Sequence, residues 1–408
     1  MKRIVYLIDQ PFDARNYERF GVQAWLENGW SVEVWDLTSW AFPRAWKDFV
    51  ESGRVLKKFP GYFSLESKRD LEERRRVANR VSHFIDLSGD NYCSLRAKHA
   101  LTSLGARHIV LVGASHNPDP EVGWACRLRN AFLKGPRKAL PALRAAVARE
   151  IAASTIRPDL VVVTGRESFP RATRGRKMLK AHSLDYDIYL NLKRETGTSV
   201  NSYGVFIDQN YCFHSDFICG DRNFFVTPNK YFPSVRNGLE TMSSALKVEV
   251  RIAAHPRASY REMAAEYFKD YPVEYGRTAP LIRDCRFVVC HDSTAIQLAV
   301  LFGKPAIFVT TDELVPAYEG RCIEKAAFEL GKTVINLDRG LDGVDWQREI
   351  RVDAGRYAEY RNKYIKVDGS PEKPFWDIVI EHVEGDERSL AGFHDESTRS
   401  RLHTAANS

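Results

Sequence analysis

The stretch RFVVCHDSTAIQLAVLFGKPAIFV, residues 286–309, decides the fold prediction for this chain. An apolar run ends at Cys290, a polar cluster follows, a helix opens at Ser293 and Thr294, and a Gly-Lys-Pro turn leads into a second apolar run. This order is typical of a βαβ unit. Backbone N–H groups at a helix start are unpaired and the helix dipole is positive there, so this position would stabilise a phosphate or carboxylate. Simple helix capping by Asp292 or Ser293 explains the same residues equally well.

The composition indicates a large soluble globular protein. The chain has 408 residues, 44% of them apolar and 12% aromatic, which suggests two domains. Its seven cysteines include no C-x-x-C pair, which indicates reduced thiols and a cytoplasmic location. The apolar run near the N-terminus is too short for a signal peptide, and no segment reaches the roughly 18 to 20 apolar residues of a membrane span. The net charge of +7 is modest and predicts no nucleic-acid partner.

Basic residues cluster between Arg127 and Arg149, where they are interleaved with apolar residues. Such a segment could lie on an anionic membrane surface or meet a polyanionic acceptor. A solvated helix face explains the same pattern and is the favoured interpretation. We therefore expect a cytoplasmic protein, with peripheral contact to the inner face of the cytoplasmic membrane as an open alternative.

Strands and helices alternate in both halves of the sequence, which predicts an α/β fold with two doubly wound, Rossmann-like domains. The polar segment 196–202 separates them, although the G-x-G-x-x-G fingerprint of dinucleotide binding is absent after the first strand. The expected strands are 3–8, 31–36, 83–87, 108–112, 159–163, 203–207, 248–254, 286–290, 306–309 and 333–336, and residues 40–82 are expected to be helical. The predicted domains are 1–200, 201–370, a closing helix at 371–385 and a polar tail at 386–408.

Polar residues follow the strands of the second half at the edge where ligands bind in open α/β sheets. Asp208, His255 and Ser293 each come directly after a predicted strand, and Pro256 stops its strand so that the imidazole can project. Three such residues on one sheet favour a phosphate pocket more strongly than any one of them. In the first half the corresponding residues are Ser115, His116 and Glu167, each of which is more often a cap than a catalyst.

A metal site is not expected. Asp185 and Asp187 form a D-x-D pattern, but it stands at the start of a structured strand or helix rather than in a loop that could hold a metal-bound sugar nucleotide. The sequence therefore predicts metal-independent chemistry without a cofactor.

Several motifs together resemble a known family. These are VFIDQ at 205–209 with HSDF at 214–217, AAHPR at 253–257, and HDSTA at 291–295 with FGKPAIF at 302–308. They resemble bacterial surface-polysaccharide glycosyltransferases of the GT-B type, most closely the retaining β-Kdo transferases of capsule and O-antigen (lipopolysaccharide) synthesis that use CMP-activated sugars. Bacterial sialyl- and polysialyltransferases are more remote. The resemblance covers about residues 200–315, and the N-terminal half only in architecture.

The resemblance implies two Rossmann-like domains that face each other across a cleft, with the nucleotide sugar on the C-terminal domain and the acceptor on the N-terminal one. His255 and Pro256 would contact the nucleotide phosphate, and Ser293 and Thr294 would complete its site. Asp208 would form a covalent sugar adduct. The chain lacks a clear D/E-D/E-G base motif of the sialyltransferases, which weakens the inverting alternative.

Two further assignments follow from the same comparison. His291 lies in the phosphate motif, and its role is open between phosphate binding and capping. Ser115, His116 and Glu167 would contact the acceptor.

The predicted function is transfer of a sugar, Kdo in the first place, from a CMP-sugar to an oligosaccharide or lipid-linked glycan of the bacterial surface, with retention. Three alternatives stay open. The donor could be CMP-sialic acid or another nonulosonate with inversion, or a UDP-sugar. The chain could be a UDP-sugar epimerase of similar shape. It could also be a non-catalytic nucleotide-sugar-binding component of a polysaccharide assembly complex.

Overall fold

The computed structural model describes most of the chain. The described residues are 2–78, 81–114, 147, 155–172, 175–195, 202–213, 226–256, 258 and 260–387. The predictions for Ser115 and His116, for the basic residues of 127–149 and for the tail from 388 onward lie outside the described residues.

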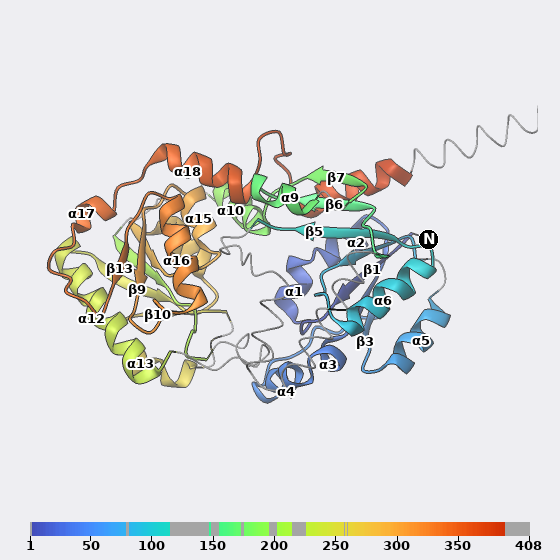
Figure 1. Ribbon diagram of the computed structural model, residues 1–408, viewed down its shortest axis with the longest axis horizontal. Helices are drawn as coiled ribbons and strands as arrows, with labels where there is room; N and C mark the ends of the chain where they lie inside the picture. Colours follow the sequence, from blue (N-terminus) through green and yellow to red (C-terminus); the bar gives the residue numbers. More distant parts are fainter. Residues whose placement is uncertain are drawn as a thin grey trace, which may run out of the picture.

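Two parallel sheets organise the described chain (Figure 1). The first has seven strands in the order β3-β2-β1-β4-β5-β6-β7, and the second has six in the order β10-β9-β8-β11-β12-β13. The direction of the order reverses between β1 and β4 in the first sheet and between β8 and β11 in the second, so each sheet has one topological switch point. Both halves are Rossmann-like α/β units, as predicted.

The strands have the following bounds. In the first sheet they are β1 Arg3–Ile8, β2 Ser31–Asp36, β3 Tyr62–Ser64, β4 His83–Asp86, β5 Arg107–Val112, β6 Leu160–Val163 and β7 Lys177–Lys180. In the second they are β8 Tyr203–Ile207, β9 Glu249–Ala253, β10 Val273–Glu274, β11 Phe287–Cys290, β12 Ala306–Thr310 and β13 Val334–Asn336.

Helices connect these strands. In the first half they are α1 Ala14–Arg19, α2 Val22–Glu27, α3 Thr38–Ala41, α4 Pro43–Glu51, α5 Lys68–Val77, α6 Tyr92–Ser103, η1 Arg166–Ser168 and α9 Phe169–Ala172. The later ones are α10 Leu184–Arg194, α12 Pro228–Leu246, η2 Arg261–Met263, α13 Ala264–Phe268, α14 Thr278–Asp284, α15 Ile296–Leu301, α16 Tyr318–Glu329, α17 Trp346–Glu349, α18 Ala354–Tyr360 and η3 Arg361–Ile365.

Burial explains which strands the sequence predicts. The central strands β8, β11 and β12 are buried at every residue, as parallel strands covered on both faces are, and their apolar runs are clear in the sequence. The edge strands β3, β7 and β10 were not predicted, and β3 lies in the segment expected to be helical. Their side chains are half-buried or exposed, so they lack a continuous apolar run.

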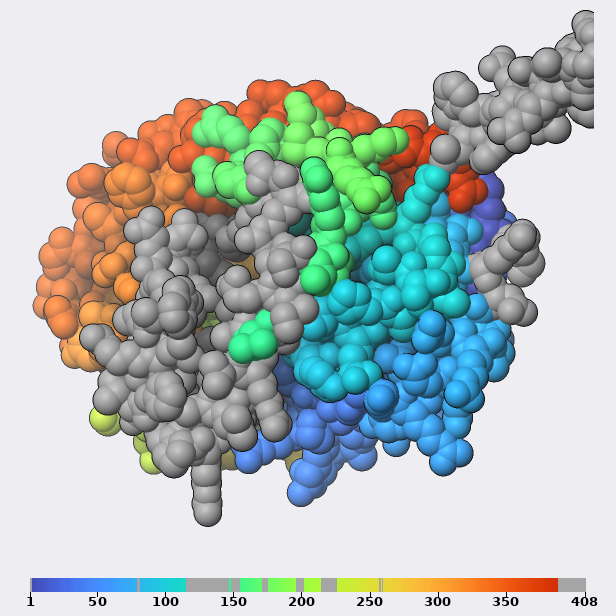
Figure 2. Space-filling view, turned by 45° about the vertical axis from the view of Figure 1, so that its right-hand side comes forward, coloured from blue at the N-terminus to red at the C-terminus, as the bar shows by residue number. Residues whose placement is uncertain are grey.

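The predicted closing helix is a helix over residues 375–387, and it packs on the first sheet. Phe375, Trp376 and Val379 join the same buried cluster as Tyr6 of β1. The indole Nε1 of Trp376 donates to the carbonyl oxygen of Arg19 at 2.9 Å. The chain therefore returns from the second half to the first at its C-terminal end, and Figure 2 shows this orange-to-red segment along the top of the molecule.

Backbone contacts hold η3 (Arg361–Ile365), here called the crossing segment because it leads to the closing helix, against the carboxyl end of the first sheet. The Ser183 N–H, just past β7, donates to the carbonyl oxygen of Ile365 at 2.7 Å. At Gly165, just past β6, a Cβ atom would lie 2.1 Å from the carbonyl oxygen of Lys363, so the close approach requires glycine. The predicted boundary at residue 200 falls directly before β8, although α10, which precedes it, packs against α14 and α15 of the second half.

The first predicted helix, residues 15–28, is divided into α1 and α2. Gly21 between them has φ of +62°, the left-handed region that favours glycine. A Cβ atom at Gly21 would also lie 2.1 Å from Cδ1 of Trp376. Gly21 is therefore required both for the turn between α1 and α2 and for the close approach of the closing helix.

The two requirements at Gly21 can be separated with Gly29, which has φ of +75° and open space around its Cα. We expect Gly29→Ala to lower the free energy of unfolding by about 1 kcal/mol, because only the left-handed backbone opposes the methyl group. Gly21→Ala should cost a further 1 to 3 kcal/mol or so, because the methyl group overlaps the Trp376 ring. Urea unfolding of both variants measures the difference, and equal losses would show that the contact with Trp376 adapts freely.

Candidate functional site

The switch point of the second sheet carries a polar clamp between two strand ends. Gln209 follows β8 and Asp292 follows β11. The Gln209 amide donates to Asp292 Oδ1 at 2.6 Å, and the Asp292 N–H donates to Gln209 Oε1 at 2.9 Å. The Tyr211 hydroxyl donates to the same Asp292 oxygen. These bonds fix the two loops relative to each other. Gln209 and Tyr211 were not predicted as site residues, and Asp292 was left open between the phosphate pocket and helix capping.

His291 lies beneath this clamp and has a positioning role. Its ring has no exposed surface. Nδ1 lies 2.7 Å from the carbonyl oxygen of Val309, which can only accept, so Nδ1 carries the proton. Nε2 therefore accepts from the Tyr231 hydroxyl at 2.9 Å. Burial lowers the pKa of His291 to about 4, so the ring is neutral at pH 7. A buried ring with both nitrogens engaged holds β11 against β12 and α12 rather than contacting a phosphate.

Ser293 and Thr294 present their hydroxyls at the same strand end. Ser293 is half-buried, its Oγ accepts the Ala295 N–H at 3.3 Å, and Thr294 is exposed. The predicted helix start at Ser293 was wrong by three residues, because 3₁₀-type bonds to the carbonyl oxygens of residues 293–295 precede α15. The two hydroxyls therefore belong to a turn whose preceding residue, Asp292, is held by the clamp.

Asp208 and His255 meet at the ends of the neighbouring strands β8 and β9. The Asp208 carboxyl is 1% exposed and accepts a hydrogen bond from the Tyr260 hydroxyl. Burial raises the pKa of Asp208, while hydrogen bonds from Tyr260 and from backbone N–H groups, including that of His255, act in the opposite direction. His255 is half-buried and Pro256 is exposed. The hydrogen bond from Tyr260 thus ties the end of β8 to the segment that follows His255.

The structure brings most of the predicted residues of the second half together. Asp208, His255 and Ser293 lie on the ends of β8, β9 and β11, which are adjacent strands. Glu167 of η1 is exposed at the end of β6, two strands away from the switch point of the first sheet.

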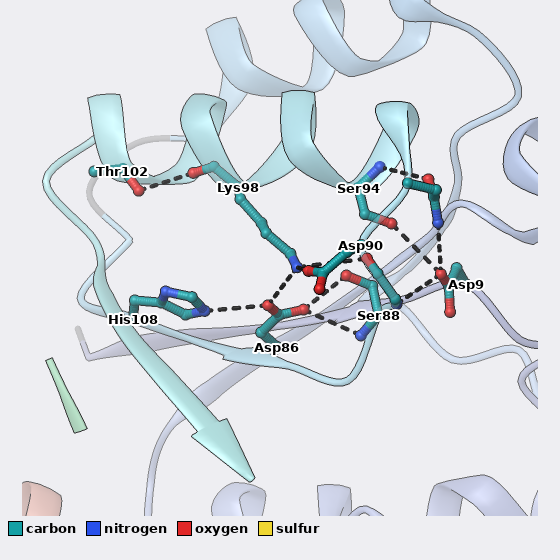
Figure 3. A network of polar contacts seen from close by, with 10 residues as sticks. Asp9, Asp86, Ser88, Asp90, Ser94, Lys98, Thr102 and His108 are labelled. Carbon is teal, nitrogen blue, oxygen red and sulfur yellow. Dashed lines mark hydrogen bonds and ion pairs between the residues drawn. The ribbon is translucent and has the colours of Figure 1, made fainter. Parts of the chain in front are cut away.

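The switch point of the first sheet carries a polar network that was not predicted (Figure 3). Asp9 follows β1 and is half-buried. Its Oδ2 accepts from the Gly89 N–H and from the Asn91 amide, each at 2.8 Å. Burial is the main cause that raises the pKa of Asp9, and the nearby Asp86 carboxylate raises it further. Asp9 therefore has the environment of a carboxylate that takes up a proton more readily than usual.

Asp86 is the centre of this network. It is 8% exposed, and its Oδ2 lies 2.8 Å from Lys98 Nζ and 3.2 Å from His108 Nε2. Its Oδ1 accepts from the N–H and the hydroxyl of Ser88. The hydrogen bond from His108 and the charge of Lys98 outweigh burial and hold the pKa of Asp86 below its usual value. Asp86 stays ionised and fixes the loop that contacts Asp9.

One signal in the sequence could have identified Asp9. The criterion that selected Asp208, a polar residue directly after an apolar strand, applies equally to Asp9 after residues 4–8. Lys98 and His108 carry no such signal, since they lie inside a helix and a strand and gain a partner only through the fold.

Removing the cation of this network should be costly. Lys98 is 4% exposed, so Lys98→Met leaves the buried Asp86 carboxylate without its main charge partner, and we expect a loss of about 3 to 5 kcal/mol at pH 7. Lys47→Met, which removes an exposed cation paired with Glu51 on α4, is the matched control and should change stability little.

The pH dependence of this loss follows from the lowered pKa of Asp86. A carboxyl with a depressed folded pKa contributes stability above its unfolded value, near 3.8, and loses that contribution as the pH falls through the folded pKa. The difference between wild type and Lys98→Met, measured by urea unfolding, should be full above about pH 5 and shrink in more acidic buffer. A pH-independent difference would show that lost packing, not charge, causes it.

Comparison with solved structures identifies the fold. The glycosyltransferase of kitacinnamycin is 12% identical, over 88% of this chain and 94% of that one, with a TM-score of 0.50. Spinosyn rhamnosyltransferase SpnG, complexed with thymidine diphosphate, is 14% identical over 89% and 93%, with a TM-score of 0.43. UDP-GlcNAc 2-epimerase of Methanocaldococcus jannaschii, in complex with UDP-GlcNAc and UDP, is 11% identical over 94% and 100%, with a TM-score of 0.45.

Neither a protein-family model nor a curated protein matches the sequence. Within the described residues, no helix is both long and apolar enough to cross a bilayer. The two parallel sheets and the similarity to the kitacinnamycin enzyme show that this chain has the GT-B fold with two Rossmann-like domains, as predicted.

Proposed function

We propose that this chain is a glycosyltransferase that moves a sugar from a nucleotide sugar to a glycan acceptor. The observation that supports it most is that each of the two parallel sheets ends in an ordered polar cluster at its own switch point. Ligands of open α/β sheets bind outside the carboxyl ends of the strands at such a point. Two such points in one GT-B chain provide one site for a donor and one for an acceptor.

In this proposal the donor phosphate binds at the second sheet, against His255, Ser293 and Thr294. Their loops are held by buried groups: the Asp208 carboxyl below His255, and the clamp of Gln209 and Asp292 before Ser293. Hydrogen-bond donors that are held in place before the reaction stabilise the charge that develops on the leaving phosphate, because they do not have to reorganise during the reaction. Loss of the phosphate-linked nucleotide then requires no metal, in line with the sequence prediction.

The donor we propose is a CMP-sugar, CMP-Kdo in the first place, and the acceptor is a bacterial surface glycan such as a lipopolysaccharide or capsule precursor. The support is the resemblance of the AAHPR and HDSTA motifs to those of CMP-sugar-dependent transferases, together with the position of both motifs on neighbouring strands of one sheet. Action at the inner face of the cytoplasmic membrane is part of this proposal, since the acceptor is lipid-linked.

The catalytic carboxylate in this account is Asp9 rather than Asp208. A nucleophile must reach the anomeric carbon, whereas Asp208 is 1% exposed and bonded to Tyr260, so we assign it to positioning the His255 turn. Asp9 follows β1 of the first sheet, where we place the acceptor, and it has a raised pKa, as a general base requires. Asp9 takes the proton of the acceptor hydroxyl, the acceptor oxygen bonds to the anomeric carbon, and the nucleotide leaves with the electron pair of the broken C–O bond. This route inverts the anomeric centre, and it therefore replaces the retention through an Asp208 adduct that the resemblance implies.

Asp9→Asn tests this role with two readouts of opposite sign. Transfer should fall by about 100-fold or more, because the base is lost. The melting temperature at pH 7.5 should rise, since a carboxyl with a raised folded pKa stabilises the fold below its unfolded pKa and loses that contribution as the pH rises through the folded pKa. Asn is neutral at all these pH values and keeps the oxygen that accepts from Gly89 and Asn91.

Asp90→Asn in the same loop is the matched control, and it should leave transfer within about twofold of wild type, because this carboxyl is 48% exposed at the end of the Lys98 network. Unchanged transfer by Asp9→Asn would exclude Asp9 as the base. A lower melting temperature would show that its charge is needed by the fold.

Nucleotide binding tests the donor site. CMP should raise the melting temperature of the wild type more than UDP or GDP at equal concentration, in line with a ligand that binds only the folded state. Ser293→Ala should reduce the shift, whereas Ser103→Ala, which removes a hydroxyl bonded to a backbone carbonyl at the end of α6, should not. Stabilisation by UDP or GDP but not by CMP would contradict the CMP-sugar assignment. Binding of a nucleotide sugar with no transfer to any glycan would favour the non-catalytic alternative.

A further inference from the structure

A cavity with charged residues in its wall lies at the amino edge of the first sheet, the edge opposite to the switch point. Its volume is about 380 Å³, and it lies between the first residues of β4 to β7 and the closing helix 375–387. His83 and Arg107, which are register partners at the starts of β4 and β5, line it from the sheet. His382 and Asp386 line it from the helix. The cavity is therefore shared by two parts of the chain that are distant in sequence.

The residues that line the cavity include three basic side chains and two carboxylates, so one cation is in excess. Lys177 pairs with Asp386 at 2.6 Å, and Arg176 pairs with Asp159 at 3.4 Å. The guanidinium of Arg107 makes no hydrogen bond or ion pair with any described residue, although it lies near both His83 and Asp386. An Arg guanidinium presents paired N–H donors that match a carboxylate or phosphate. Arg107 is thus the cation of this wall with which an oxyanion would pair.

Two histidines line the same cavity, and each has a buried ring nitrogen without a hydrogen-bond partner among the described residues. His83 is 4% exposed, and its Nδ1 is buried without a partner. The closest carboxylate oxygen, from Glu387, is 3.7 Å away, beyond hydrogen-bond distance. Nε2 of His382 is likewise buried without a partner. Buried polar nitrogens of this kind are costly unless something in the cavity satisfies them.

The protonation state of His83 limits which class of ligand the cavity can bind. Burial, reinforced by the charge of Arg107, lowers the pKa of His83 to about 4. The ring is therefore neutral at pH 7 and offers one donor and one acceptor, so it suits a hydroxyl or amide group rather than a second anionic group. The volume is at the lower end of small-molecule sites. A ligand with a single acid group and a small body fits both the charge and the size.

We propose that this cavity is a second binding site, for a small metabolite whose carboxylate or phosphate pairs with Arg107 and whose body packs against His83 and His382. The site is separate from the donor and acceptor sites, which lie at the carboxyl edges of the sheets. Because its ligand contacts both the sheet and the closing helix, binding holds that helix on the first domain. The site goes beyond the proposed transfer reaction and does not depend on it.

Calorimetric titration with two probes tests the site: sodium phosphate and sodium acetate, each at constant ionic strength made up with chloride. Wild type should bind one equivalent of at least one probe, and the preferred probe distinguishes a phosphorylated ligand from a carboxylated one. Arg107→Gln should weaken binding by at least about 10-fold, because a charge-assisted bidentate contact is lost. Arg107→Lys, which keeps the charge but not the fork, should give an intermediate affinity.

Two controls locate the binding. Arg69→Gln removes an exposed cation of α5 that pairs with Glu73, and it should bind like wild type. Ser293→Ala alters the proposed phosphate site and should also bind like wild type. Loss of phosphate binding in Ser293→Ala would assign the ion to the donor site and overturn the proposal. Absence of saturable binding of both probes to wild type, or unchanged binding by Arg107→Gln, would overturn it too. Because the Arg107 guanidinium has no hydrogen-bond or ion-pair partner among the described residues, its replacement leaves none of their groups unpaired.

Discussion

The structure depends on one constraint: all strand pairs in both sheets run parallel. Parallel strands are covered by helices on both faces, so their side chains are buried and apolar, as in β8, β11 and β12. Most of the polar side chains described above therefore lie at the two edges of a sheet. The carboxyl edges hold the networks of Asp9 and Asp86 in one half and of Gln209 and Asp292 in the other, and the amino edge of the first sheet holds the cavity of Arg107.

Buried polar groups in these networks position the exposed ones. His291 and Asp208 have almost no accessible surface, and each fixes a turn that presents a hydroxyl or an imidazole at the sheet edge. The crossing segment acts at a larger scale: it contacts the ends of β6 and β7, and the closing helix then packs beside Gly21 and β1. The two domains are therefore joined by well-packed backbone contacts, and a ligand beneath the closing helix would act on the same connection.

Most of the fold was predictable because central parallel strands produce long apolar runs. Three of the four edge strands, β3, β7 and β10, were missed since their side chains are partly exposed. The division of α1 from α2 was missed since it rests on the left-handed backbone of Gly21, against which the distant Trp376 packs. The strand-end criterion predicted that Asp208, His255 and Ser293 meet, and it would have found Asp9 as well. It could not separate buried positioning residues from exposed ones: His291 and Thr294 stand three positions apart, and only the packing of α12 and β12 shows that one is enclosed and the other is not.

A crystal structure of the protein with bound CMP tests the position of the donor site most directly. We expect the phosphate within hydrogen-bond distance of the Ser293 or Thr294 hydroxyl and of His255, with the bonds between Gln209 and Asp292 unchanged. The side of the phosphate that carries the sugar in the donor should face toward Asp9 of the first sheet. A nucleotide bound elsewhere, with these side chains free of contact, would contradict the assignment of the donor site to the switch point of the second sheet.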